Sequence, residues 1–158
     1  MNYDKTALLQ AVKESLTDGF TNIHEASEMA RDDSIRAPGR MESRYDSSRE
    51  ELGALADSLN NRKAEIASGL ASLSGCPLPE NPTRVGLGCI ALVELIGKGQ
   101  VLEYFVLPYG GGTRIKGPRD EILVVTPESP IAEAMLGRCI GSRFTTRSQK
   151  QYQVKEII

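Results

Sequence analysis

Hydrophobic residues in the first half of the chain recur at helical spacing. Over residues 4–32 the apolar positions step mostly by three, four and seven, as they do in a helix with one buried stripe. These positions are Leu9, Val12, Leu16, Phe20, Ile23 and Ala30. A second stripe of the same kind runs from Tyr45 to about residue 74, and Pro38-Gly39 between the two is a strong turn signal. We therefore predict an antiparallel helical hairpin, a short coiled coil in which each stripe is buried against the other.

The second half of the chain has the spacing of strands. Residues 76–83 contain three prolines, which stop a helix and stiffen a connection, so we interpret them as a linker. Apolar or alternating runs then follow, each short enough to be a strand. These runs are residues 89–96, 101–107, 121–126, 143–146 and 151–157. Residues 109–120, which contain four glycines, are expected to form a loop.

The run Thr126–Gly137 predicts a sharp corner and a short helix. Ser129 is a good N-cap, and Pro130 stands where a first helical residue tolerates a missing N–H. Gly137 is placed to end the helix. The expected fold class is therefore α+β: an N-terminal helical hairpin (1–75), a proline-rich linker (76–83), and a C-terminal domain (84–158) with a five-stranded antiparallel sheet and one helix.

Composition and charge narrow the function classes. The chain has 158 residues and a formal net charge of −2, which argues against binding nucleic acid mainly through phosphate contacts. Three widely spaced cysteines form no metal-binding motif, so we expect free thiols and no cofactor. No signal-peptide pattern or membrane-length apolar run occurs, which favours a cytoplasmic protein without membrane partners. The one histidine, His24, is expected at the surface or in the helical seam.

The corner also resembles a known signature. Ser-Pro-Ile-Ala followed by Ala-Met-Leu-Gly-Arg, at 129–138, is similar to the motif of the bacterial Gre (GreA/GreB) transcription-elongation factors. Residues 85–88, 140–142 and 152–157 resemble that family as well. The resemblance implies an FKBP-like C-terminal domain and RNA polymerase as the partner. It also implies that the domain docks near Ser129, Pro130 and Ile131 while the coiled coil enters the secondary channel.

At the tip of the hairpin the chain departs from that family. Acidic tip residues of Gre factors help to hold magnesium at the polymerase active site and promote cleavage of backtracked RNA. Here the corresponding positions are Pro38 and Met41. Arginines and carboxylates surround them: Asp32, Asp33, Arg36, Arg40, Glu42 and Asp46. The carboxylates are either solvated helix-end charges or apex groups, in which case Asp33 and Glu42 would share a magnesium ion.

Three functions follow from these patterns. The first is a Gre-like regulator that binds RNA polymerase, contacts transcript RNA at most indirectly and stimulates cleavage weakly or not at all. The second is a peptidyl-prolyl isomerase, which shares the implied fold and requires an aromatic-lined apolar pocket. The third is a structural module that dimerises through the coiled-coil seam.

Overall fold

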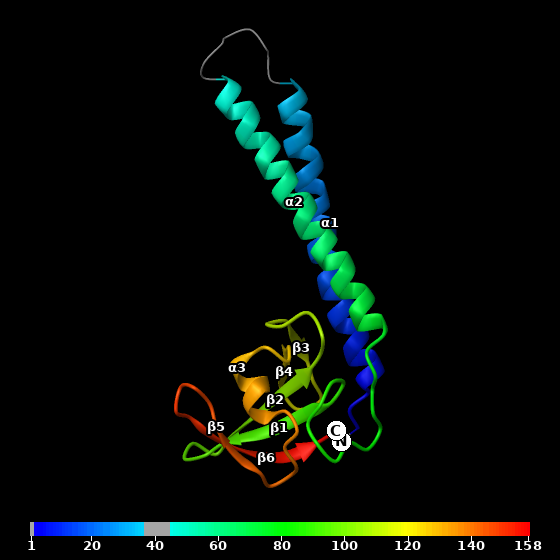
Figure 1. Ribbon diagram of the computed structural model, residues 1–158. Helices are drawn as coiled ribbons and strands as arrows, with labels where there is room; N and C mark the ends of the chain where they lie inside the picture. The colour runs from blue at the N-terminus through cyan, green and yellow to red at the C-terminus, as the bar shows by residue number, and fades with distance from the viewer. Residues whose placement is uncertain (1, 37–44) are drawn as a thin grey trace. The chain divides into compact units, whose positions relative to one another are not determined.

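Two long helices occupy the first half of the chain in the computed structural model, which describes residues 2–36 and 45–158, with the backbone alone described at 34–36 and 45–49. They are α1 (Lys5–Arg36) and α2 (Tyr45–Ser74), drawn in blue and in cyan to green in Figure 1. A carboxylate oxygen of Asp4 accepts a hydrogen bond from the backbone N–H of Ala7 at 3.0 Å, which caps the start of α1. The predicted helices are confirmed, and α1 extends four residues beyond the predicted end at 32. The turn predicted at Pro38-Gly39 lies outside the described residues.

Contacts between the two helices show that they run antiparallel. The Ser27 hydroxyl donates to the amide oxygen of Asn60 at 3.1 Å, and Lys63 Nζ lies 2.7 Å from His24 Nδ1. Along the pair, residue numbers on α2 increase from 60 to 63 while those on α1 decrease from 27 to 24. The two helices therefore run in opposite directions, as in a helical hairpin. Ser27 is buried, whereas His24 is exposed, which is one of the two places expected for it.

The second half of the chain forms one six-stranded sheet with the order β3-β4-β2-β1-β6-β5. The strands are β1 (Ile90–Leu95), β2 (Gln100–Val106), β3 (Arg114–Lys116), β4 (Glu121–Val125), β5 (Arg143–Thr145) and β6 (Gln151–Ile157). A short helix, α3 (Pro130–Met135), separates β4 from β5. The α+β class is therefore confirmed, and all five predicted strands are present.

The prediction of a purely antiparallel, five-stranded sheet was wrong in two details. Residues 114–116, which fall inside the predicted loop, form the edge strand β3 against β4. This additional reversal brings the chain back beside β2 in the same direction, so that β2 and β4 pair in parallel. The other neighbouring strands pair antiparallel. The extra strand was missed because Ile115, its one buried apolar side chain, stands in a run with four glycines and no other hydrophobic residue between Gly110 and Asp120.

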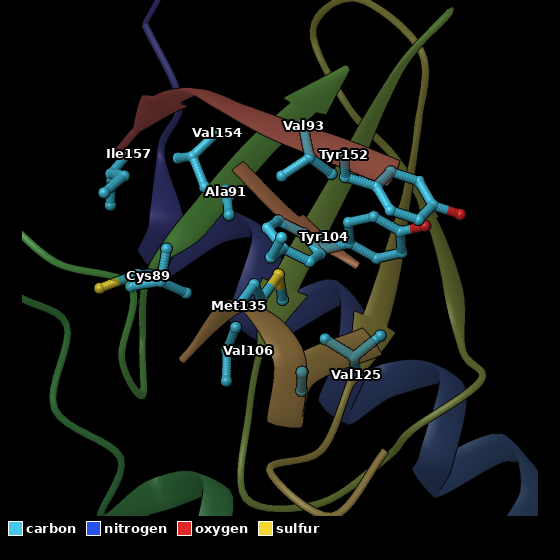
Figure 2. Close-up of a cluster of buried hydrophobic side chains, with 13 residues drawn as sticks. Cys89, Ala91, Val93, Tyr104, Val106, Val125, Met135, Tyr152, Val154 and Ile157 are labelled. Atoms are coloured by element: carbon cyan, nitrogen blue, oxygen red, sulfur yellow. The ribbon is translucent and has the colours of Figure 1, made fainter. Parts of the chain in front are cut away.

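One face of the sheet packs against α3. Ala132 and Met135 of the helix are fully buried and belong to a cluster with side chains from the central strands (Figure 2). Tyr104 and Val106 come from β2, and Val154 comes from β6. The alternation along β2 sends Leu102, Tyr104 and Val106 to this face and the residues between them to the other.

The opposite face is also apolar and is contacted by the ends of the long helices. Fully or almost fully buried side chains line it: Ile90, Leu92, Phe105, Leu107, Ile122 and Val124. The hydroxyl of Tyr3 donates to Oε1 of Glu103, the one charged residue on the apolar β2, at 2.9 Å. On α2, the missing side chain of Gly69 leaves room for the ring of Tyr109. These contacts hold the residue Tyr3, just before α1, against β2 and the end of α2 against the segment that follows β2.

The contacts divide the chain into two compact units. One comprises Met1–Ser15 and Gly69–Ile158, and the other comprises Leu16–Ser68. The sheet, α3 and the terminal turns of the long helices thus belong to one unit. The remaining parts of α1 and α2 form the other. Neither helix, within the described ranges 5–36 and 45–74, has an apolar stretch long enough to cross a membrane.

Candidate functional site

The corner before α3 forms by local hydrogen bonds. The backbone N–H of Ser129 donates to the carbonyl of Thr126 at 2.9 Å, which closes a turn after β4. Ser129 has extended backbone angles, and its hydroxyl oxygen accepts from the N–H of Ala132 at 3.4 Å. Pro130 occupies the first helical position, where its lack of an N–H costs no helical hydrogen bond. The predicted N-cap and helix start are confirmed.

The end of α3 is anchored to Val85, which precedes β1. Gly137 adopts a positive φ of 75° just after the helix, a conformation that glycine adopts without strain. Its N–H donates to the carbonyl of Val85 at 2.8 Å, and the N–H of Val85 donates to the carbonyl of Arg138 at 2.9 Å. Because both ends of this six-residue helix are hydrogen-bonded, the corner is held at a defined position on the domain.

The corner presents a small, mixed surface. Pro130 is exposed, while Ser129 and Ile131 are half-buried. Ile131 packs partly on the core beneath α3. The exposed carboxylate of Glu133 forms an ion pair with Arg147 at 3.0 Å. The three residues that the sequence analysis singled out are therefore adjacent and accessible to a partner.

The residues assigned to the hairpin tip are only partly described. Asp32 and Asp33 are exposed, and both belong to α1, which continues to Arg36. Two negative charges close to the C-terminal end of a helix are electrostatically unfavourable. Asp46 lies in the first turn of α2, and Arg40 and Glu42 lie outside the described residues. Among the described residues, no group of three His, Cys, Asp or Glu side chains is arranged to hold a metal ion.

Four of the five aromatic residues of the C-terminal domain are buried in its core. Phe105, Phe144, Tyr104 and Tyr152 are at most 8% exposed, and the rings of Phe144 and Tyr152 stack with centroids 5.5 Å apart. A surface pocket of about 230 Å³ lies near the starts of β2 and β4. Its lining is mostly polar, including Glu103, Arg114 and Glu121, with Tyr104 as its one aromatic residue. This pocket lacks the aromatic, apolar lining that a prolyl isomerase requires.

The sequence analysis missed the contact between Tyr3 and Glu103. Both residues are nearly buried, and the second carboxyl oxygen of Glu103, Oε2, has no hydrogen-bond partner among the described residues. Burial, followed by the hydrogen bond to Glu103, raises the pKa of Tyr3 to about 12. The one available signal was a glutamate inside the otherwise apolar run 101–107, which a buried partner would explain.

Comparisons with known proteins give structural matches only. Neither a protein-family profile nor a curated protein matches this chain. The solved structure of GreA factor homolog 1 (Gfh1) from Thermus thermophilus is 19% identical, with 92% of this chain and 94% of that chain covered and a TM-score of 0.39. Gfh1 from Thermus aquaticus is 20% identical, with 94% of each chain covered and a TM-score of 0.38. A structure of the transcription factor Gfh1 is 18% identical, with 92% of each chain covered and a TM-score of 0.41.

Proposed function

We propose that this chain is a Gre-like regulator of transcription elongation that acts by binding RNA polymerase in the cytoplasm. The observation that carries the proposal is the corner formed by Ser129, Pro130 and Ile131. The motif that resembles the Gre signature folds into a capped, anchored helix start with an accessible surface. It does so on an α+β domain that follows a pair of long antiparallel helices.

In this proposal, the parts of the chain have separate roles. The helical hairpin of residues 1–75 enters the secondary channel of the polymerase. Residues 76–83 link it to the domain of residues 84–158, which has an FKBP-like fold and docks through the corner at the start of α3. The chain is then not an enzyme itself, and its contact with transcript RNA is indirect.

The docking role can be tested with Ser129→Asp. Aspartate is as good an N-cap as serine, so the helix start keeps its acceptor while the surface gains a negative charge next to Glu128. We expect roughly tenfold weaker binding to bacterial RNA polymerase, equivalent to about 1.4 kcal/mol. The matched control is Ser148→Asp, which adds the same charge at an exposed turn between β5 and β6.

Binding should be measured by pull-down and by titration, with circular dichroism to show that both variants remain folded. The proposal fails if the unmodified chain does not bind the polymerase. If the chain binds but both variants retain full affinity, docking through the corner is wrong, although a Gre-like role through another surface would survive.

The hairpin tip leads us to propose binding without strong stimulation of RNA cleavage. Pro38 and Met41 provide no oxygen ligand, and the neighbouring arginines are at 36 and 40. A positive charge a few ångströms from a magnesium ion costs about 1 kcal/mol or more at an effective dielectric near 20. We therefore expect little cleavage in stalled elongation complexes to which the protein binds.

A cleavage assay also tests the remaining alternative at the tip. If cleavage is strong, Asp33 and Glu42 are the carboxylates expected to share the magnesium ion, and replacing both with alanine should abolish it. Strong cleavage that survives this double replacement would contradict our assignment of the tip.

The alternative function, a structural module that dimerises through the coiled-coil seam, is tested separately by sedimentation at several concentrations. A monomer at all concentrations would exclude it.

A further inference from the structure

The linker lies directly against the residues that lead into β1. A Cβ atom built on Gly88 would stand 1.7 Å from the carbonyl oxygen of Pro77 and 3.2 Å from Cδ of Pro79. The backbones of Pro77 and Gly88 are therefore in van der Waals contact, with Cα atoms within roughly 6 Å of one another. Gly88 has a positive φ of 75°, so glycine is required there by conformation as well as by space.

A cysteine stands next to each side of this contact. Cys76 immediately precedes Pro77, and Cys89 immediately follows Gly88. Both thiols are free; Cys76 is half-buried, while Cys89 is 2% exposed. The sulfur of Cys89 points away from the other labelled core side chains in Figure 2. The sulfur of Cys76 lies 3.6 Å from the carbonyl oxygen of Pro77, the same oxygen that packs against Gly88.

The charge of a Cys89 thiolate acts on both Cys76 and Lys5. Burial raises the pKa of Cys76, and the negative charge of a Cys89 thiolate raises it further. Lys5 is close to the same pair: its ammonium group donates to the carbonyl of Pro79, and a Cys89 thiolate opposes the lowering of the Lys5 pKa by burial. The thiolate is the reactive form in thiol–disulfide exchange.

We propose that Cys76 and Cys89 are a redox-active pair that closes to a disulfide when the protein meets a disulfide oxidant such as oxidised glutathione. The more accessible Cys76 thiolate attacks the glutathione disulfide and releases one glutathione thiolate. The Cys89 thiolate then attacks the Cys76 sulfur of the mixed disulfide and releases the second glutathione. The two thiol protons end on two glutathione thiols, and the protein pair is oxidised by two electrons.

Closure would fix the linker to the start of the sheet. The ring it forms spans residues 76–89 and contains all three linker prolines. Glutathione and an exposed thiol would reverse the reaction, so the bond responds to the redox state of the compartment. A bridge of this kind requires Cα atoms at most about 7 Å apart. Cys76 and Cys89 each stand one residue from the contact between Pro77 and Gly88.

The full-length protein should be equilibrated with reduced and oxidised glutathione at increasing oxidised fraction, quenched with an alkylating reagent and analysed by mass spectrometry. The sequence suits this experiment because trypsin separates the three cysteines into the peptides 64–84, 85–98 and 139–143. We expect peptides 64–84 and 85–98 to become linked with the loss of two hydrogen atoms, while Cys139 remains alkylated.

Three variants make the result decisive. Cys139→Ser should leave the linked peptides unchanged, whereas Cys76→Ser and Cys89→Ser should each abolish them. Three outcomes would overturn the proposal: all thiols stay alkylatable at the oxidising end, Cys76 stops at a glutathione adduct while Cys89 stays free, or the linked peptides contain Cys139. Circular dichroism of the serine variants shows whether either substitution unfolds the domain. If one does, Cys→Ala at the same position replaces it.

Discussion

Removing the hydroxyl of Tyr3 should destabilise the unit that contains the sheet. The change Tyr3→Phe keeps the ring, so the loss is confined to the hydrogen bond of 2.9 Å to Glu103. The Glu103 side chain is only 5% exposed, and its other oxygen already has no partner among the described residues. The substitution therefore leaves a buried carboxyl group without a hydrogen bond in the described structure. Such a group costs about 1–3 kcal/mol, and we expect a value near 2 kcal/mol.

Urea denaturation at neutral pH measures this loss. Near-ultraviolet circular dichroism is a suitable signal because four of the five tyrosines lie in the unit that contains the sheet. We expect a lower midpoint with an unchanged dependence on urea. Tyr109→Phe is the matched control, since its hydroxyl has no hydrogen bond within the described residues, and it should change stability by less than about 0.5 kcal/mol.

A second background separates the hydrogen bond from other effects of the substitution. In Glu103→Leu the buried carboxyl group is absent, so Tyr3→Phe should cost far less there than in the natural chain. Equal costs in the two backgrounds would refute the assignment of the free energy to this pair. So would a Tyr3→Phe variant as stable as the Tyr109→Phe control.

Two further predictions concern high pH and two glycines. The pKa values of Tyr3 and Tyr104 are raised to about 12, chiefly by burial, from an ordinary value of 10.0. Both tyrosines therefore contribute stability that is present in full below pH 10 and lost as the pH rises toward 12; tyrosinate absorbance that rises with an ordinary pKa in the folded protein would contradict this. Gly69→Ala places a Cβ 2.1–2.4 Å from three ring atoms of Tyr109 and should lower the thermal midpoint. Gly53→Ala, in the same helix with no atom within 4 Å, should instead add about 1 kcal/mol; equal stabilisation by both would show that the ring moves aside freely.

The corner before α3 could be predicted because its chemistry is local. Ser129, Pro130 and Gly137 each act on the backbone within a few residues, through a cap, a fixed φ and a positive φ. The candidate docking site therefore follows from a short run of sequence. Its biological role does not, because an N-cap and a helix start have the same requirements whether or not a partner binds there.

Short sequence patterns identified five strands but not the sixth strand or the way that the strands pair. Ile115 is the one hydrophobic residue between Gly110 and Asp120, so the edge strand β3 lies in a glycine-rich run that resembles a loop. The parallel pairing of β2 with β4 depends on where the chain returns. The contact between Tyr3 and Glu103 joins residues 100 positions apart. The contact between Pro77 and Gly88 likewise depends on the packing of the linker.

In the pair of α1 and α2, different residues determine that the helices pair and in which register they pair. The apolar stripes predict that α1 and α2 pair, but leucine-like residues at regular spacing pack nearly as well after a shift along the seam. Ser27 is 2% exposed and bonds to Asn60, so a shift would leave a buried hydroxyl without this partner. The pattern of apolar residues does not include the polar Ser27, so it could not predict that this residue is buried in the helical pair. The apolar residues thus account for the pairing of the helices, and the buried serine accounts for their register.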